Sequence, residues 1–243
     1  MANDTHISGS GRLTGGDYNE IHISGSGHWD GPIHCSEFHV SGACKGTGDL
    51  TVTDSMHCSG SLRTDGHMDC GQVRISGSAR VGGNITGRDE VRISGSLVCH
   101  GLYGGKITVS GGLDVQTDVE ADSFALSGMA KIQGLLNAEE VDITVGGMPG
   151  TVVIGQIGGS RITVRTAETR GFLRKLVSGR RASAGEVKAG SIEGDDIDLT
   201  AVAADVVRGN NVTLRDGCCI KRVEYTGNLT LEGDAQADEQ IRI

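Results

Sequence analysis

The stretch Ile75-Ser76-Gly77-Ser78 returns as Ile93-Ser94-Gly95-Ser96, and the same four residue types also occur at residues 7–10 and 23–26. Degenerate copies complete a frame whose units begin at Thr5, Ile21, Phe38, Met56, Val73, Val91, Ile107 and Phe124, with a ninth start at Val141. Successive starts lie 16 to 18 residues apart. A repeat of this length indicates a solenoid in which each unit forms one turn.

Within this frame, position 4 is Ser and position 5 is Gly in all eight complete units, and position 3 is always apolar. Further apolar residues recur at positions 7 and 9 and near position 13. Each unit therefore consists of three short strands separated by corners, where we expect Gly because positive φ is needed and a Cβ would be costly. The pattern predicts an all-β fold, a triangular parallel β-solenoid whose turns of about 17 residues stack about 4.8 Å apart.

The repeat is less regular after Val141. Ile162 and Val164 repeat the first strand, a basic segment follows, and apolar residues then resume at intervals of five. The resumed positions are Ile192, Ile197, Val202, Val207 and Val212. The sequence thus predicts about 13 turns: N-terminal turns in residues 1–164, a basic excursion at 165–188, and C-terminal turns of the same solenoid at 189–243.

The composition favours a thin core. Of 243 residues, 40 are Gly, seven are aromatic and two are Pro, so Ile, Val, Leu and Cys must fill the interior. No stretch reaches the roughly 18 apolar residues of a spanning helix, and residues 1–5 lack the features of a secretory signal. Seven cysteines without a CxxC pair favour reduced thiols. These features predict a cytoplasmic protein.

The charge is unevenly distributed. From Arg161 to Lys188 there are eight basic and two acidic residues, so this stretch carries +6 and the rest carries −9 minus 6, or −15. A short amphipathic helix here would contain Phe172, Leu173, Arg174, Lys175, Leu176, Val177, Arg180 and Arg181. Such a helix could fold against an anionic membrane surface, at the inner face of the cell membrane, or against a protein partner. The alternative is a solvated excursion between turns.

The Ile-Ser-Gly-Ser turns, together with residues 135–139 and the stretch from 191 to 225, resemble the bactofilins, a bacterial cytoskeletal family that forms polymers. The resemblance covers essentially the whole chain and implies a right-handed β-helix. It also implies filaments that form without nucleotide, are non-polar, and support cell shape, wall synthesis or motility. The implied partners are the protein itself and a paralogue. Short members carry Pro-rich tails and an N-terminal membrane-targeting segment, and this chain shows neither.

End-to-end association is also expected from the residues. Neither the first nor the last predicted turn has a recognisable cap, so strand edges and apolar side chains would be uncovered at both ends. Contact between like ends about a two-fold axis would give a non-polar filament. The predicted interface residues are Ile7, Leu13, Leu229, Leu231, Ile241 and Ile243. The alternative is a monomer whose last edge is protected by Asp234, Asp238 and Glu239.

No catalytic constellation stands out, and we predict a non-enzymatic protein without cofactor, metal or nucleotide. Residues 101–107 lack the first Gly and the Ser or Thr of a phosphate loop. Cys44, Cys58, Cys99 and Cys218 occupy inward positions of the frame, which favours packing over zinc binding. The alternative function is a β-helix enzyme acting on a saccharide or acyl substrate. Nucleic-acid binding is not expected, because one short basic segment on an acidic chain would bind weakly.

One outward pattern remains. His6, His22, His39 and His57 occupy position 2 of four consecutive units, and Arg74 and Arg92 continue the series. We call these four residues the histidine column. Imidazoles about 4.8 Å apart could stack, bind a divalent metal or sense pH, because neighbouring protonated rings repel one another. The alternative is that solenoids simply stack like residues at exposed positions.

Overall fold

The protein is represented by a computed structural model that describes residues 3–146, 151–167 and 187–243. All secondary-structure elements in these residues are β-strands, and the paired strands run parallel. The stacked turns number about 13. The structure therefore confirms the predicted parallel β-solenoid. In this part of the chain no helix is long and apolar enough to cross a membrane.

The chain divides into two compact units, Met1–Phe124 and Ala125–Ile243, hereafter unit 1 and unit 2. The strands of unit 1 are β1 (Asn3–Ile7), β2 (Ser10–Ile23), β3 (Ser26–Val40), β4 (Ala43–Gly46), β5 (Leu50–Cys58), β6 (Ser61–Thr64), β7 (Met68–Ile75), β8 (Ser78–Val81), β9 (Ile85–Ile93), β10 (Ser96–Cys99), β11 (Leu102–Val109) and β12 (Gly112–Val115). β13 (Val119–Leu126) lies at the boundary. The strands of unit 2 are β14 (Met129–Val145), β15 (Val152–Thr166), β16 (Val187–Leu199), β17 (Val202–Leu214), β18 (Cys219–Leu231) and β19 (Gln236–Arg242).

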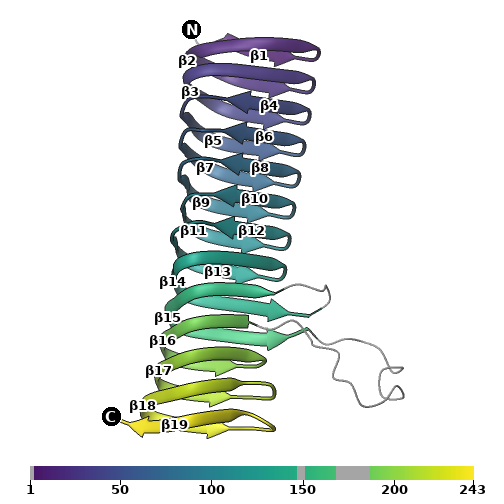
Figure 1. Ribbon diagram of the computed structural model, residues 1–243. Helices are drawn as coiled ribbons and strands as arrows, with labels where there is room; N and C mark the ends of the chain where they lie inside the picture. The colour runs from purple at the N-terminus through teal and green to yellow at the C-terminus, as the bar shows by residue number, and fades with distance from the viewer. Residues whose placement is uncertain (1–2, 147–150, 168–186) are drawn as a thin grey trace, which may run out of the picture. The chain divides into compact units, whose positions relative to one another are not determined.

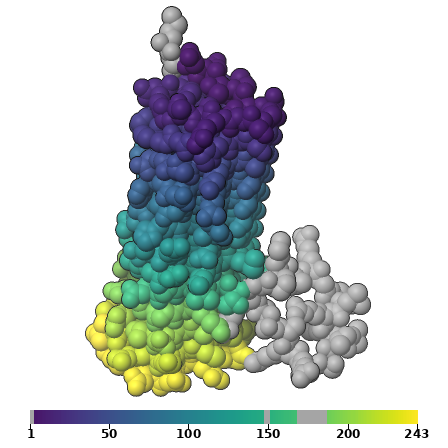
Figure 2. Space-filling view, turned by 45° about the horizontal axis from the view of Figure 1, so that its top comes forward, coloured from purple at the N-terminus to yellow at the C-terminus, as the bar shows by residue number. Residues whose placement is uncertain are grey.

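The predicted frame sets the register of unit 1. Ile7 lies beside Ile23, Ile23 beside Val40, and the same pairing continues from one turn to the next. Figure 1 shows these turns stacked one on another, and in Figure 2 their atoms form a continuous surface. The inward side chains at positions 1, 3, 7 and 9 thereby form continuous buried columns. Their burial supplies the main stabilisation of the fold.

The corners of unit 1 correct one expectation. The Ser-Gly glycines do not adopt positive φ; the positive-φ glycines of the described residues are Gly16, Gly31, Gly146, Gly217 and Gly233. A Cβ added to Gly60 would instead overlap the carbonyl oxygen of Gly42 in the preceding turn. The backbone N–H groups of Ser59 and Gly60 both donate to Val40 O, at 2.8 and 3.1 Å. Close approach between turns, rather than left-handed backbone, therefore requires glycine at this position.

The largest core side chain lies near the start of unit 1. Trp29 is fully buried, and its ring packs edge-on against Phe38 with ring centroids 5.7 Å apart. In the next turn the register places Gly46 beside Trp29, where a Cβ would overlap the indole ring. The bulk of Trp29 thus fills space that two successive turns share, which compensates for the scarcity of aromatic residues.

In β16 and β17 of unit 2 the buried residues lie five positions apart. Val187, Ile192 and Ile197 pair with Val202, Val207 and Val212, as the spacing of apolar residues predicts. β15 extends to Thr166 and β16 begins at Val187, so residues 165, 166, 187 and 188 of the predicted excursion belong to strands.

Candidate functional site: the last turn and the histidine column

The last turn, residues 229–243, exposes apolar side chains. Among the described residues, the large apolar side chains that are exposed are Met129, Val153, Leu231, Ile241 and Ile243. Three of these five belong to the last turn: Leu231 is 42% exposed, Ile241 38% and Ile243 70%. β19 pairs with β18 on one side, and its other edge presents backbone N–H and C=O groups without a strand partner among the described residues. Exposed apolar groups beside a strand edge are features of an assembly surface.

The register of β19 shows which side chains face inward. Ala237 follows the buried Ile220, and Gln240 follows the buried Val223. Ile241 follows Glu224, so it lies on the outward side of the strand rather than above the core. The uncovered end of unit 2 therefore combines Leu229 and Leu231 with small and polar side chains from β19. Ile241 lies on the outward side beside this end, and Ile243 is 70% exposed.

The apolar side chains of the first turn are less exposed than those of the last turn. Ile7 is only 9% exposed and Leu13 only 6%, although both were expected at an end surface. The hydroxyl of Tyr18 donates to Thr14 O at 2.8 Å, which fixes this aromatic side chain within the first turn. The two predicted ends therefore differ, and the apolar exposure is concentrated in the last turn. Sequence reasoning missed Tyr18 because an isolated aromatic residue gives no repeat signal.

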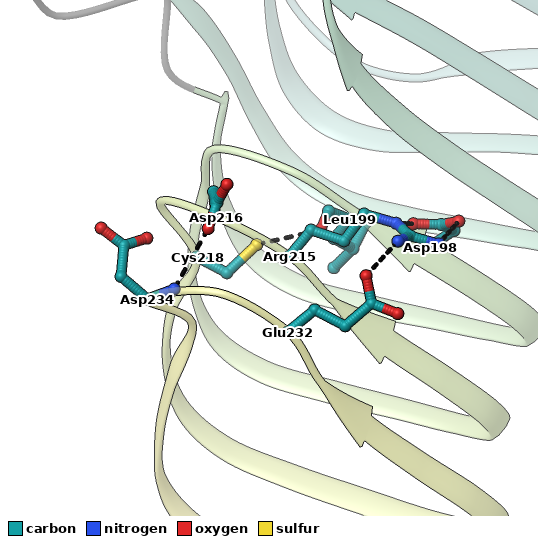
Figure 3. A network of polar contacts seen from close by, with 7 residues as sticks. All are labelled: Asp198, Leu199, Arg215, Asp216, Cys218, Glu232 and Asp234. Carbon is teal, nitrogen blue, oxygen red and sulfur yellow. Dashed lines mark hydrogen bonds and ion pairs between the residues drawn. The ribbon is translucent and has the colours of Figure 1, made fainter.

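Acidic side chains form ion pairs and hydrogen bonds between the last turns (Figure 3). Arg215 forms ion pairs with Asp198 in the preceding turn and Glu232 in the following one. Asp234 accepts a hydrogen bond from Gly217 N at 2.6 Å, and Asp216 accepts one from Asp234 N at 3.1 Å. The carboxylate of Asp234 thus stabilises the corner at Gly217 of the preceding turn. Of the two other acids considered as edge protection, Glu239 lies 3.5 Å from the Arg222 guanidinium and Asp238 lines a surface pocket.

The histidine column forms as the frame predicts. The rings of His6 and His22 stack with centroids 4.8 Å apart, and those of His22 and His39 with centroids 4.6 Å apart. The ring of His57 is tilted, 6.2 Å from that of His39. His22 lies 3.4 Å from Glu20, and His39 lies 2.9 Å from Glu37. The column is therefore a stacked array with carboxylates beside two of its members.

His57 differs electrostatically from an isolated imidazole. Its pKa is lowered from the ordinary value of 6.5, mainly because partial burial disfavours the charged ring. The positive charges of His39 and Arg74 lower the pKa further. Nε2 of His57 is 2.8 Å from the Ser59 hydroxyl, a partner that carries no compensating negative charge. In the described residues no group of three or more His, Cys, Asp or Glu side chains is arranged to hold a metal ion.

The inward cysteines are packed thiols. Cys44, Cys58, Cys99 and Cys218 are all buried, as their positions in the frame predict. Burial raises the pKa of the Cys44 and Cys99 thiols to about 12 and that of Cys58 to about 11. Such thiols remain protonated and are poor nucleophiles or metal ligands at neutral pH. Cys219 is the exposed thiol.

The predicted membrane or partner contact between residues 172 and 181 lies outside the described residues. Of the basic residues that flank it, Arg161 forms an ion pair with Glu140 at 2.5 Å, and Arg165 pairs with Asp142. Part of the positive charge of this region is therefore compensated within unit 2.

Two proteins of Bacillus subtilis strain 168 resemble part of the chain. It is 34% identical to the uncharacterized protein YhbE over 113 residues, which cover 46% of this chain and 45% of YhbE. It is 32% identical to the uncharacterized protein YhbF over 111 residues, which cover 45% of this chain and 42% of YhbF. The chain thus matches less than half the length of either relative. No protein-family model and no solved structure matches the chain.

Proposed function

We propose that the protein is a structural, non-enzymatic component that assembles end to end into filaments through the last turn of unit 2. The observation that carries this proposal is the concentration of exposed Leu231, Ile241 and Ile243 beside the unpaired edge of β19. An exposed parallel strand can pair with a second copy through its backbone. Apolar contact then contributes about 25 cal/mol for each Å² removed from water.

The same surface on two copies meets about a two-fold axis, which gives an isologous contact. Filament growth also requires association at the first turn, where β1 pairs with β2 on one side only in the described residues. A filament in which contacts between two last turns alternate with contacts between two first turns is non-polar. No nucleotide enters this scheme. The resemblance to bactofilins supports such a polymer and a scaffolding role in cell shape, wall synthesis or motility.

The experiment compares two substitutions of matched exposure. Leu231 is 42% exposed in the last turn, whereas Val153 is 41% exposed on β15. We expect Leu231→Lys to stop assembly, because it places a charge on the apolar surface that must lose water on contact. Val153→Lys adds the same charge elsewhere in unit 2 and should assemble like the wild type. Sedimentation velocity over a concentration series measures both.

Assembly of Leu231→Lys at wild-type concentrations would contradict the assignment of the interface. Loss of assembly in both variants would also contradict it, because a general charge effect would then explain the result. The emission of the sole tryptophan, Trp29, verifies that each variant is folded, since this side chain is fully buried.

A further inference from the structure

A second outward column of unit 1 consists only of basic residues over five consecutive turns. Position 8 of the repeat is occupied by Arg12, His28, Lys45, Arg63 and Arg80, which we call the cation column. The strand register places each of these residues directly beside the next. The column ends where Arg80 meets Val98, which in turn meets Asp114. At about 4.8 Å per turn, its five members span about 19 Å.

The first two members are neutralised within the protein. Asp30 lies 2.5 Å from the Arg12 guanidinium and 3.1 Å from Nε2 of His28. The hydrogen bond from Arg12 is the main reason why the pKa of Asp30 is lowered. Repulsion between these two turns is thus offset by an acid placed between them.

The last three members have no such compensation. Lys45, Arg63 and Arg80 are exposed, and among the described residues none of them forms an ion pair or a side-chain hydrogen bond. Asp65, which lies two residues after Arg63, also forms no ion pair among the described residues. Like charges directly opposite each other on neighbouring strands are destabilising. Three of them in succession, in a chain of net charge −9, indicate a role in binding an anion.

The neighbouring column supplies hydroxyl groups. Ser61 and Ser78 lie two residues before Arg63 and Arg80 and are exposed, so they share the outward face of the same strands. Guanidinium groups bind phosphate or sulfate through paired N–H donors, and hydroxyls add further donors. The turn of Lys45 has Ala43 at this position, so the face offers one cation in each of the three turns and a neighbouring serine hydroxyl in two of them.

The shape of the charged region distinguishes a polymer from a membrane. The cations form a file one residue wide along the stacking direction rather than a broad patch. Among the described residues, the exposed large apolar side chains all belong to unit 2, so this face of unit 1 has none to insert between lipids. A narrow file without an apolar anchor fits an extended chain that follows the stacked turns.

We propose that the cation column of unit 1, centred on Lys45, Arg63 and Arg80, binds a linear polymer of phosphate or sulfate groups that runs across successive turns. Each turn offers one cationic group, so the contact is additive along the polymer. Binding is electrostatic and depends on salt, because bound cations release the counterions of the polymer. The column belongs to unit 1, whereas the last turn belongs to unit 2.

The test is fluorescence anisotropy with labelled long-chain polyphosphate and, in a second arm, labelled heparin. For three neutralised charges, the wild-type affinity should fall by about 20- to 40-fold between 50 and 200 mM salt. The triple variant Lys45→Gln/Arg63→Gln/Arg80→Gln should bind at least about tenfold more weakly at 50 mM salt and lose most of this salt dependence. The polymer that binds with the higher affinity shows whether phosphate or sulfate is the preferred group.

The matched control is Arg161→Gln/Arg208→Gln/Lys221→Gln, which removes the same charge from residues that form ion pairs in unit 2. It should bind like the wild type. The variant Arg63→Lys/Arg80→Lys keeps the charges and should retain binding within a few-fold, and Trp29 emission verifies folding. Equal losses in the two triple variants would overturn the proposal. So would wild-type binding to vesicles of anionic phospholipid with none to either polymer.

Discussion

The turns of unit 1 and the last turns of unit 2 stack in the same parallel register but form their corners differently. In unit 1 the corner glycine packs against a carbonyl group of the preceding turn, as Gly60 does against Gly42. In the last turns of unit 2, Ala201, Gly217 and Gly233 have positive φ, which among the described residues of unit 1 is found only at Gly16 and Gly31 in the first two turns. Ion pairs of Arg215 add links between these turns. Gly60 must be glycine because the neighbouring turn approaches closely, whereas Gly217 is favoured mainly by its own positive φ.

The largest effect should come from a Cβ at a neighbour-dependent corner. We expect Gly60→Ala to lower the free energy of unfolding by about 3 kcal/mol, because the methyl group overlaps backbone that cannot move without separating two turns. Gly217→Ala should cost about 1 to 2 kcal/mol, the strain of a left-handed residue with a side chain. Denaturant unfolding followed by Trp29 emission and circular dichroism measures both.

Gly9→Ala is the control for this comparison. Gly9 occupies the same position of the repeat, but a Cβ there would have no atom within 4 Å. Its substitution should change stability by no more than about 0.5 kcal/mol. A large loss in Gly9→Ala, or equal losses in Gly60→Ala and Gly217→Ala, would break the distinction between the two kinds of corner.

A smaller effect should distinguish the charges of the two units. Arg215→Gln removes ion pairs with two neighbouring turns and should cost up to about 1 kcal/mol, less at high salt. Arg63→Gln removes an unpaired cation between two others and should leave stability unchanged or raise it slightly. Thermal melts of both variants at low and high salt measure the difference. A greater loss in Arg63→Gln would contradict our description of the cation column.

The smallest effect is on pH dependence. His57 of the histidine column lies in unit 1. The pKa of His57 is lowered in the folded protein, so the unfolded chain binds its proton more tightly. Its contribution to stability is complete above pH 6.5 and is lost as the pH falls from 6.5 through the lowered pKa. The melting temperature of the wild type should therefore fall more steeply than that of His57→Gln, and parallel curves would contradict this.

The inward columns of unit 1 were predictable from the sequence because burial constrains them. Ile23, Val40 and Cys58 follow one another in space as they do in the frame. The same reasoning placed the histidine column correctly, since outward residues between two inward ones inherit the register. The cation column was equally readable at position 8. Polar positions carry no packing signal, so the pattern alone does not distinguish this column from an ordinary solvated surface.

Two features could not be derived from the pattern alone. The close approach of Gly60 to Gly42 depends on the distance between corners, which residue types do not specify. In the last turn no Ser-Gly pair fixes the register, and Gln240 rather than Ile241 follows Val223. A shift of one residue moves a side chain to the opposite face of a strand, so alternation alone could not place Ile241.

Negative-stain electron microscopy of the purified protein without nucleotide, at physiological and at high salt, tests the central claim most directly. The account predicts thin, unbranched filaments for the wild type and for Val153→Lys, and isolated short particles for Leu231→Lys. Filaments should persist at high salt, because apolar contact at Leu231 is strengthened rather than screened by salt. Isolated particles of the wild type at every concentration, or filaments of Leu231→Lys, would contradict assembly through the last turn.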